Sequence, residues 1–166
     1  MSYDGRAIAN FVLDFCEAKQ RGISNLSLQK IVFFCHAWSL IQLKRPLVKH
    51  QFEAWQYGPV LQYLYHEFSA FDRESIRGRA KSIDPTTGNR QVVEYGFDEE
   101  TRALLEKVVG FYSELSAGEL VRLSHAKGGP WHSVWSHQER VNPGMKIGNL
   151  SIVEFYSKMR APFSVQ

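Results

Sequence analysis

Three of the six histidines lie close together late in the chain and are of a residue type that binds metal ions. They are His125, His132 and His137. Zinc sites in proteins take cysteine, histidine or carboxylate ligands at short, regular spacings. No CxxC pair, HExxH helix or carboxylate at such a spacing accompanies these histidines. We therefore predict no metal site and no cofactor, and we interpret the three histidines as residues at the edge of a wet aromatic surface.

Two pairs of neighbouring side chains contain groups that transfer protons, His66 with Glu67 and Cys35 with His36. Adjacent residues on a helix do not face each other, so neither pair is arranged for catalysis. The sequence also has no GxSxG elbow, phosphate-binding glycine loop or dinucleotide-binding fingerprint. We predict that the protein is not an enzyme and has no catalytic residues.

Basic side chains gather between residues 73 and 90, where they could contact the phosphates of a nucleic acid. Acidic residues interrupt this group, and no aromatic residue alternates with the cations as in a platform for single-stranded nucleic acid. The formal net charge of the chain is +3, which falls short of a dedicated nucleic-acid binder. Nucleic-acid binding is therefore an alternative that we rank below protein binding. Its candidate residues are Arg73, Arg77, Arg79 and Lys81, with Arg90 beside them.

Aromatic residues in two segments without helical periodicity are the strongest candidates for binding. Residues 52–57 read FEAWQY and residues 130–135 read PWHSVW, and together they hold three of the four tryptophans. Most such residues belong to the core. Tryptophan and tyrosine that stay partly exposed, however, are favoured anchors of protein interfaces. We predict that a partner protein binds Trp55, Tyr57, His66, His125 and Trp131.

The stretch from residue 27 to 43 predicts the helix that must position these side chains. Apolar residues cover nearly every side of it, so other parts of the protein must surround it. Several polar residues interrupt the stretch, and it is shorter than the ~20 apolar residues of a membrane span. We expect Ser27 to be its N-cap and Pro46, preceded by two cations, to end it. The stretch therefore predicts a buried central helix rather than a membrane span.

Periodicity, capping and turn signals predict the elements around this helix. The predicted elements are a helix from Asp4 to about Arg21 stopped by Gly22, a strand over 52–55, a helix that Gly58-Pro59 opens and that ends near Phe71, a hairpin with arms near 79–83 and 91–96, a helix from Asp98 to about Tyr112, and helices at the capping-box matches of Ser116 and Ser151 and at Pro130. Residues 141–148 show a turn signature without a regular period. The hairpin should pack on helices or extend the 52–55 strand, because isolated hairpins are marginal in water.

These elements predict a mainly α fold. We expect residues 1–166 to form a single compact helical domain of about six helices around the buried central helix, with a small β-hairpin or short sheet. Cys16 and Cys35 lie in apolar helical patterns and are expected to be buried free thiols. The N-terminus has no cationic segment followed by a long apolar run, which predicts a cytoplasmic protein without a membrane partner.

Short motifs that follow one another in a fixed order carry a family resemblance. They are Leu28-Gln29-Lys30, His36-Ala37-Trp38, Glu53-Ala54-Trp55, Tyr57-Gly58-Pro59-Val60, Tyr65 with Phe68, Ser116-Ala117 with Glu119-Leu120, Ser124-His125 and Pro130-Trp131. In this order they resemble the SocA-like (Panacea) antitoxin domain, which is related to phage-associated GepA-like proteins. The matches run from about residue 28 to 131.

The resemblance implies a mostly helical antitoxin of a type II toxin-antitoxin system. Such a protein neutralises a cognate protein toxin, encoded beside it, by direct binding. One branch of the family acts instead as a proteolytic adaptor that hands its toxin to a Clp-type protease, and we keep this as an alternative. The family has no established catalytic residues or cofactors to carry over.

Overall fold

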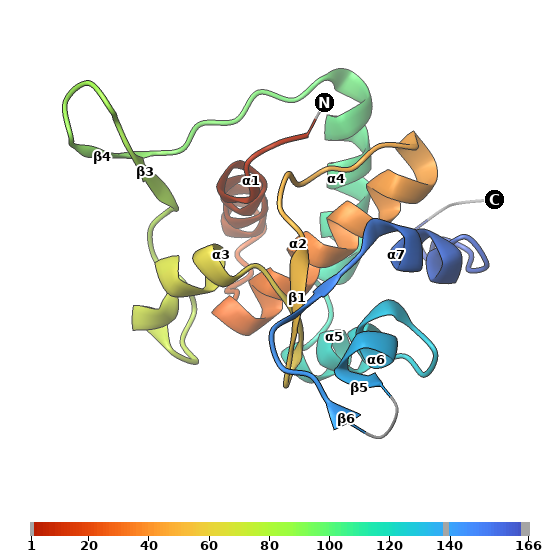
Figure 1. Cartoon of the computed structure of the whole chain (residues 1–166). Coiled ribbons are helices and arrows are strands. Elements are labelled where there is room, and N and C mark those ends of the chain that lie inside the picture. The colour runs from red at the N-terminus through yellow and green to blue at the C-terminus, as the bar shows by residue number, and fades with distance from the viewer. Residues whose placement is uncertain (1, 138–139, 164–166) are drawn as a thin grey trace.

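The computed structural model describes residues 2–137 and 140–163 (Figure 1). Helices dominate these residues and a small antiparallel sheet joins them, which confirms the predicted mainly α class. In chain order the elements are α1 (Gly5–Ala18), α2 (Asn25–Trp38), the π-helix η1 (Ser39–Leu43), β1 (Phe52–Trp55), β2 (Gly58–Val60), α3 (Gln62–Glu67), the 3-10 helix η2 (Ser69–Phe71), β3 (Lys81–Ile83), β4 (Arg90–Val92), α4 (Glu99–Tyr112), α5 (Ala117–Ser124), α6 (Pro130–Trp135), β5 (Ser136–His137), β6 (Arg140–Val141), β7 (Met145–Ile147) and α7 (Asn149–Tyr156).

Helix α2 is the buried centre of the protein, as its apolar circumference predicts. Every residue from 28 to 40 is buried, and α1, α4, α5, α7 and the sheet all pack against α2 and η1. Residues 25–43 form the one helix in the described part of the chain that is long and apolar enough to cross a membrane, yet most of that helix is buried inside the protein. The predicted cap was wrong by three residues. Ser24 is the N-cap, because its Oγ accepts a hydrogen bond from the Ser27 N–H (3.2 Å).

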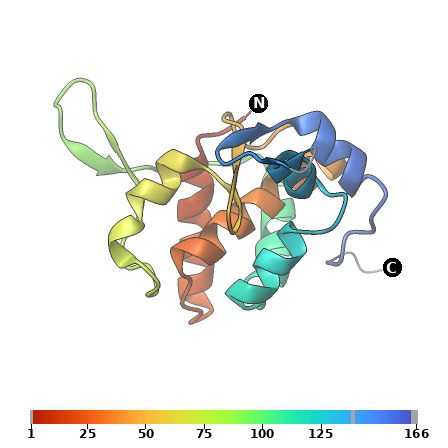
Figure 2. The ribbon, with the colours of Figure 1, turned by 60° about the horizontal axis from the view of Figure 1, so that its bottom comes forward.

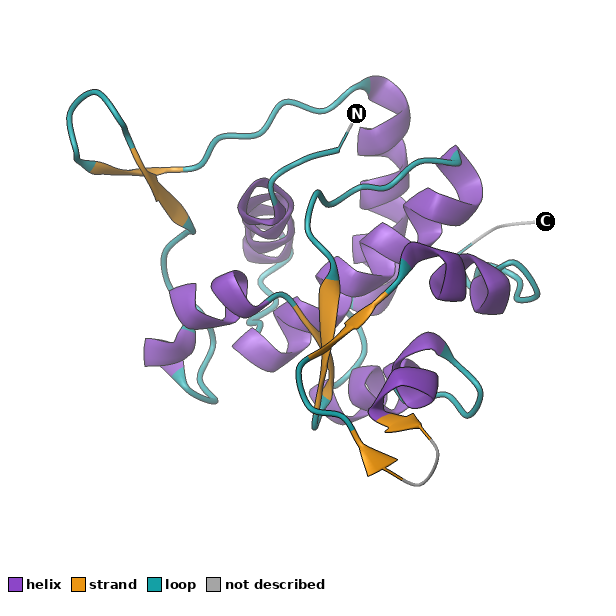
Figure 3. Ribbon diagram, in the orientation of Figure 1, coloured by secondary structure: helices purple, strands orange, loops and turns teal. Residues whose placement is uncertain are grey.

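The small sheet has the strand order β2-β1-β7 and lies across α2 (Figure 3). The strand predicted over 52–55 is β1. Two predictions beside it were wrong: Gly58-Pro59 belongs to β2 rather than to a helix, and residues 145–147 pair with β1 as β7. Both strands have three residues and are defined by pairing with β1, so they have no local period to detect. Pro59 is tolerated because β2 is an edge strand.

Most helix ends follow the predicted capping signals. Asp4 and Asp98 cap α1 and α4, and Ser116 forms the complete capping box of α5. Two end signals were wrong. The left-handed residue after α1 is Gln20 (φ 56°) and not Gly22, and the match at Ser151 is no capping box, because α7 begins at Asn149 and the Ser151 hydroxyl donates to the Gly148 carbonyl. Both cysteines are buried free thiols, as predicted.

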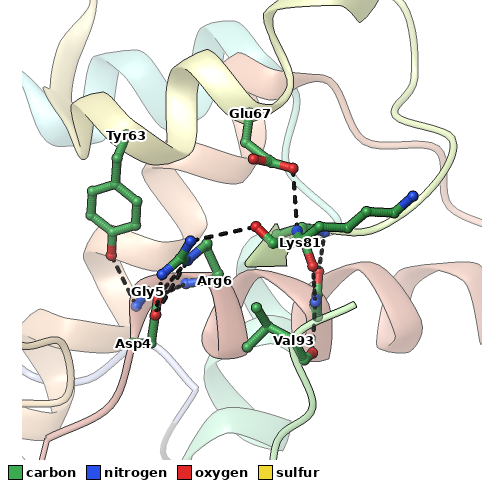
Figure 4. Close-up of polar contacts among 9 residues, drawn as sticks. Asp4, Gly5, Arg6, Tyr63, Glu67, Lys81 and Val93 are labelled. Atoms are coloured by element: carbon green, nitrogen blue, oxygen red, sulfur yellow. Dashed lines mark hydrogen bonds and ion pairs between the residues drawn. The ribbon is translucent and has the colours of Figure 1, made fainter. Parts of the chain in front are cut away.

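The predicted hairpin exists as β3 and β4 and stands out from the helical body (Figures 1 and 2). It packs on helices rather than extending the sheet. The buried Asn10 amide of α1 bonds its base three times, with the Ala80 N–H (2.7 Å), the Ala80 carbonyl (3.0 Å) and the Val93 carbonyl (2.9 Å). On the other side Glu67 of α3 accepts from the Lys81 N–H (Figure 4). The β3–β4 hairpin therefore projects from the helical body, and hydrogen bonds to α1 and α3 anchor its base.

We expect Asn10→Ala to lower the free energy of unfolding by about 3 kcal/mol, since three hydrogen bonds to buried backbone groups are lost at about 1 kcal/mol each. Urea unfolding measures the change, and limited proteolysis should show earlier cleavage near residues 80–93. Asn89→Ala at the exposed hairpin tip is the matched control and should stay within about 0.5 kcal/mol of wild type. Equal effects of the two substitutions would contradict the anchoring role of Asn10.

Candidate functional site

The buried polar side chains of α2 each hold another segment of the protein. Asn25 donates to the Tyr65 carbonyl (2.9 Å), and Gln29 donates to the Asn25 side chain. His36 accepts from two backbone N–H groups of residues 47 and 48 through Nδ1. Its Nε2 therefore carries the proton and donates to Asn149 Oδ1 (2.9 Å), and burial lowers the pKa of the ring. The polar interruptions of the central helix thus position the loops around it.

Two of these side chains fix the strand β2. Gln29 Oε1 accepts from the Leu61 N–H (3.1 Å), and Lys30 Nζ donates to the Pro59 carbonyl (2.9 Å). Lys30 is fully buried, and loss of water around the amine lowers its pKa to about 7. The Leu28-Gln29-Lys30 motif of the central helix therefore holds the Gly58-Pro59 motif in place.

Gly58 is required where it stands for two reasons. Its φ is +116°, a conformation that residues with a side chain rarely adopt. A Cβ at this position would also lie 2.6 Å from Lys30 Cε and 2.6 Å from Ser124 Oγ. The chain therefore makes its turn after β1 directly against α2 and the end of α5.

A stack of three rings also supports this turn. His125, Trp131 and Trp135 stack with nearly parallel planes, at 3.7 Å between the first two ring centres and 5.6 Å between the last two. The indole N–H of Trp131 donates to the Trp55 carbonyl (2.7 Å) at the end of β1. Burial and the charge of Lys30 lower the pKa of His125, whose buried Nε2 has no bonding partner among the described residues. The neutral ring therefore packs as an aromatic residue.

Above this framework lies an aromatic surface, the Trp55 surface, that consists of Trp55, Gln56, Tyr57, Tyr65 and Trp135. Trp55 is half-buried and packs its ring against Tyr65 (5.1 Å), whereas Tyr57 is 58% exposed. Trp55 and Gln56 line two hollows, an open one of about 460 Å³ that Trp135 borders and a narrower one of about 230 Å³ that Tyr65 borders. These hollows can receive apolar side chains of a partner.

Four of the five residues predicted to bind a partner lie at or beside the Trp55 surface with accessible side chains. Tyr57 and His66 are exposed, and Trp55 and His125 are half-buried. The His66 ring lies edge-on to Tyr65 (5.8 Å), which links it to Trp55. Trp131 differs, because only 6% of it is exposed and its ring supports the turn from within.

Sequence reasoning missed Lys30, Gly58, Tyr65 and Trp135 as parts of the site. A detectable signal existed for Lys30, since a lysine inside an apolar helix must be buried among its neighbours and must find an acceptor there. Gly58 also gave a signal, because a glycine between two strand-forming segments often has a positive φ. Tyr65 belongs to a helical pattern that gave no sign of exposure. Trp135 lies in the aromatic segment of residues 130–135, but no signal distinguished it from Trp131 there.

The cations proposed for nucleic-acid contact are partly neutralised. Arg79 pairs with Asp14 and Glu17 of α1, and Arg90 pairs with Glu67. Arg77 lies over the Phe71 ring, and Arg73 and Lys81 are exposed. These ion pairs reduce the positive field that a phosphate backbone would require.

The histidines considered for metal binding do not gather into a site in the described residues, which hold no group of three or more metal-binding side chains. His132 Nδ1 accepts a hydrogen bond from the Gly128 N–H (3.3 Å), and His125 is in the ring stack. The side chain of His137 lies outside the described residues. His66 and Glu67 serve different contacts, since Glu67 binds the hairpin.

Similarity to known proteins shows the family to which the chain belongs. The model of the family described as Antitoxin SocA-like, Panacea domain, matches residues 28–132. The chain belongs to the SocA-like Panacea antitoxin family. Antitoxin SocA of Caulobacter vibrioides (strain NA1000 / CB15N) is 39% identical to it over 147 residues, which are 89% of this chain and 76% of that relative. No solved structure matches the chain.

The family match confirms the resemblance seen in the sequence and covers most of the framework of the site, with Asn25 and Trp135 lying outside it. Residues 28–132 run from the first half of α2 to α6, and they include Gln29, Lys30, Gly58, Ser124 and Trp131. In this SocA-like chain several motif residues therefore meet around one turn, namely Lys30, Gly58, Ser124 and Trp131. Other motif residues serve other contacts, since Trp38 bonds Tyr112 and Ser116 caps α5. Membership in the family supports an antitoxin role and, with it, a role without catalysis.

Proposed function

We propose that this SocA-like chain is the antitoxin of a type II toxin-antitoxin system. It acts in the cytoplasm as one domain and neutralises a cognate protein toxin, the product of an adjacent gene, by direct binding. The relative, Antitoxin SocA, and the family of SocA-like antitoxins support the antitoxin role. The Trp55 surface is the site that we assign to the toxin.

The observation that carries this assignment is the convergence of several family motif residues, Lys30, Ser124 and Trp131 among them, on the turn between β1 and β2. Side chains from α2, α5 and α6 hold its backbone through buried contacts, while Gln56 and Tyr57 at its tip are exposed. A surface held rigidly before binding loses little conformational freedom when a partner docks. Aromatic anchors over small hollows are the residues that contribute most to protein interfaces.

Charge at this surface is balanced, so apolar contact should dominate binding. The Glu53 carboxylate accepts from the Trp55 indole N–H (3.1 Å) and pairs with Lys146 (3.3 Å). The toxin is therefore expected to present apolar side chains to the two hollows, and its affinity should change little with salt.

Co-expression tests the proposal. The adjacent gene is expressed in a host alone, with this protein, and with an unrelated protein of similar size as the control. We expect growth arrest from the gene alone and rescue only by this protein. A harmless neighbouring product, or one that stays toxic beside this protein, would overturn the proposal.

The half-life of the toxin in the same cells separates masking from the adaptor alternative. Masking predicts an inhibited toxin of unchanged half-life, because binding alone does not deliver the toxin to a protease. An adaptor that feeds a Clp-type protease predicts a shorter half-life whenever this protein is present. Rescue that disappears in a protease-deficient host would assign the adaptor mechanism.

A further inference from the structure

A second groove lies away from the Trp55 surface, between α5 and the segment that follows α7. Its volume is about 250 Å³, and it shares no lining residue with the two hollows beside Trp55. Trp38 and Tyr112 lie in its floor, joined by a hydrogen bond of 2.9 Å, and Phe155 borders it. Leu123 and Met159 at its rim are 45% and 47% exposed.

The charged residues along this groove are both arginines. Arg122 of α5 and Arg160 beyond α7 line it, no acidic residue does so among the described residues, and both arginines are exposed. In the described part of the chain neither of them forms an ion pair. Glu119 lies one turn before Arg122, but its carboxylate accepts from the Ser116 N–H (3.0 Å) in the capping box. The groove thus joins an apolar interior to two unpaired cations.

We infer that this groove binds a short amphipathic segment of another protein, one that presents bulky apolar side chains between acidic ones. The apolar side chains would enter between Leu123 and Met159, and the carboxylates would meet Arg122 and Arg160. The groove is smaller than the roughly 300–1,000 Å³ of pockets that enclose a whole small ligand, which suits the anchoring side chains of a peptide. Helical segments with apolar residues at i, i+3, i+4 and i+7 dock into such grooves.

This inference is independent of the proposed toxin site. Arg122 and Leu123 are exposed and border the groove, whereas Ser124 and His125, which follow them, pack at the turn. A partner bound at the Trp55 surface therefore leaves the groove free for a second partner. The two sites can therefore be disabled separately.

Fluorescence polarisation with a labelled helical peptide of about 15 residues tests the inference on the full chain. The probe carries leucine and phenylalanine on one face and aspartate and glutamate beside them. Two matched peptides replace the acidic residues by lysine or the apolar ones by alanine. We expect saturable binding of the acidic amphipathic probe and at least about tenfold weaker binding of both matched peptides.

Charge reversal at the groove provides the decisive variants. The double variant Arg122→Glu/Arg160→Glu should weaken the probe by about tenfold or more, whereas Lys127→Glu/Lys158→Glu, with the same change of net charge at exposed residues outside the groove, should leave it within about twofold. Leu123→Ser/Met159→Ser should also weaken it, and circular dichroism verifies that each variant is folded. Absence of saturable probe binding, equal losses in the two charge-reversed proteins, or a dimer that only Arg122→Glu/Arg160→Glu abolishes would overturn the inference.

Discussion

Gly58→Ala should destabilise the protein by about 4 kcal/mol, because it adds backbone strain of about 1–3 kcal/mol to an overpacking cost of about 1–3 kcal/mol. The strain follows from the φ of +116°, and the overpacking follows from contacts of 2.6 Å with Lys30 Cε and Ser124 Oγ. Neither neighbour moves easily, since Lys30 is fully buried and bonded to Pro59, and the buried Ser124 hydroxyl donates to the Val121 carbonyl (2.8 Å). Urea unfolding at neutral pH measures the loss.

Gly78→Ala is the matched control for this substitution. Gly78 has a similar φ of +109°, but a Cβ there would meet no atom within 4 Å. It should therefore lose only the strain contribution, about 2 kcal/mol. If both variants lose the same stability, the close packing of the turn against α2 and α5 is contradicted.

The second large expected effect is a dependence of the free energy of unfolding on pH that the buried Lys30 amine causes. Burial lowers the pKa of its amine to about 7, whereas an unfolded lysine has a pKa of about 10.4. Between these values the unfolded chain binds a proton that the folded protein does not, so stability rises with pH from about 7 to about 10. Below pH 7 the folded protein holds a buried charge, and the contribution of Lys30 to stability is at its lowest.

Lys30→Met isolates this contribution. The difference in free energy of unfolding, wild type minus variant, should be flat below about pH 7 and should then rise by several kcal/mol up to about pH 10, since tenfold in a protonation equilibrium is about 1.4 kcal/mol. Burial raises the pKa of Cys35 and of Tyr112 in both proteins, and these effects cancel in the difference. A difference that does not change with pH would show that the Lys30 amine is not buried.

The sequence predicts the elements whose signals lie within the element itself, and it misses those that depend on contacts between residues far apart in the chain. Helices α1, α2, α4 and α5 were predictable because apolar spacing and caps such as Asp98 and Ser116 lie within the helix itself. Strand β7 was not, because its pairing of Phe52 with Ile147 joins residues far apart in the chain. The anchoring of the hairpin by Asn10 is equally non-local, since its partners are 70 and 83 positions away.

The same distinction applies to the candidate site. The sequence placed Trp55, His125 and Trp131 in one predicted binding surface, and the structure brings the three together around one turn. The sequence could not show that Trp131 is buried while Tyr57 is exposed, since both are aromatic residues in segments without a period. The role of Lys30 also required the structure, because its acceptor is a backbone carbonyl 29 positions away.

The burial of Trp131 determines how the toxin site should be probed. Trp131→Ala would leave a cavity beside β1 and remove the bond to the Trp55 carbonyl, at a cost of about 3–5 kcal/mol. Weaker toxin binding by Trp131→Ala would therefore reflect a destabilised fold rather than the loss of a toxin contact. Trp55→Ala is the better substitution, because the contacts that hold the turn use the Trp55 backbone and leave its ring half-exposed.

The affinity of the purified protein for the product of the adjacent gene, measured by isothermal titration calorimetry, tests the Trp55 surface most directly. Trp55→Ala should weaken binding by about 30-fold or more, as expected for a tryptophan anchor worth about 2 kcal/mol. Ile83→Ala, at a 67% exposed residue of the hairpin, should leave the affinity unchanged. Wild-type affinity of a folded Trp55→Ala variant, together with a loss in Ile83→Ala, would contradict the account and move the interface to the hairpin.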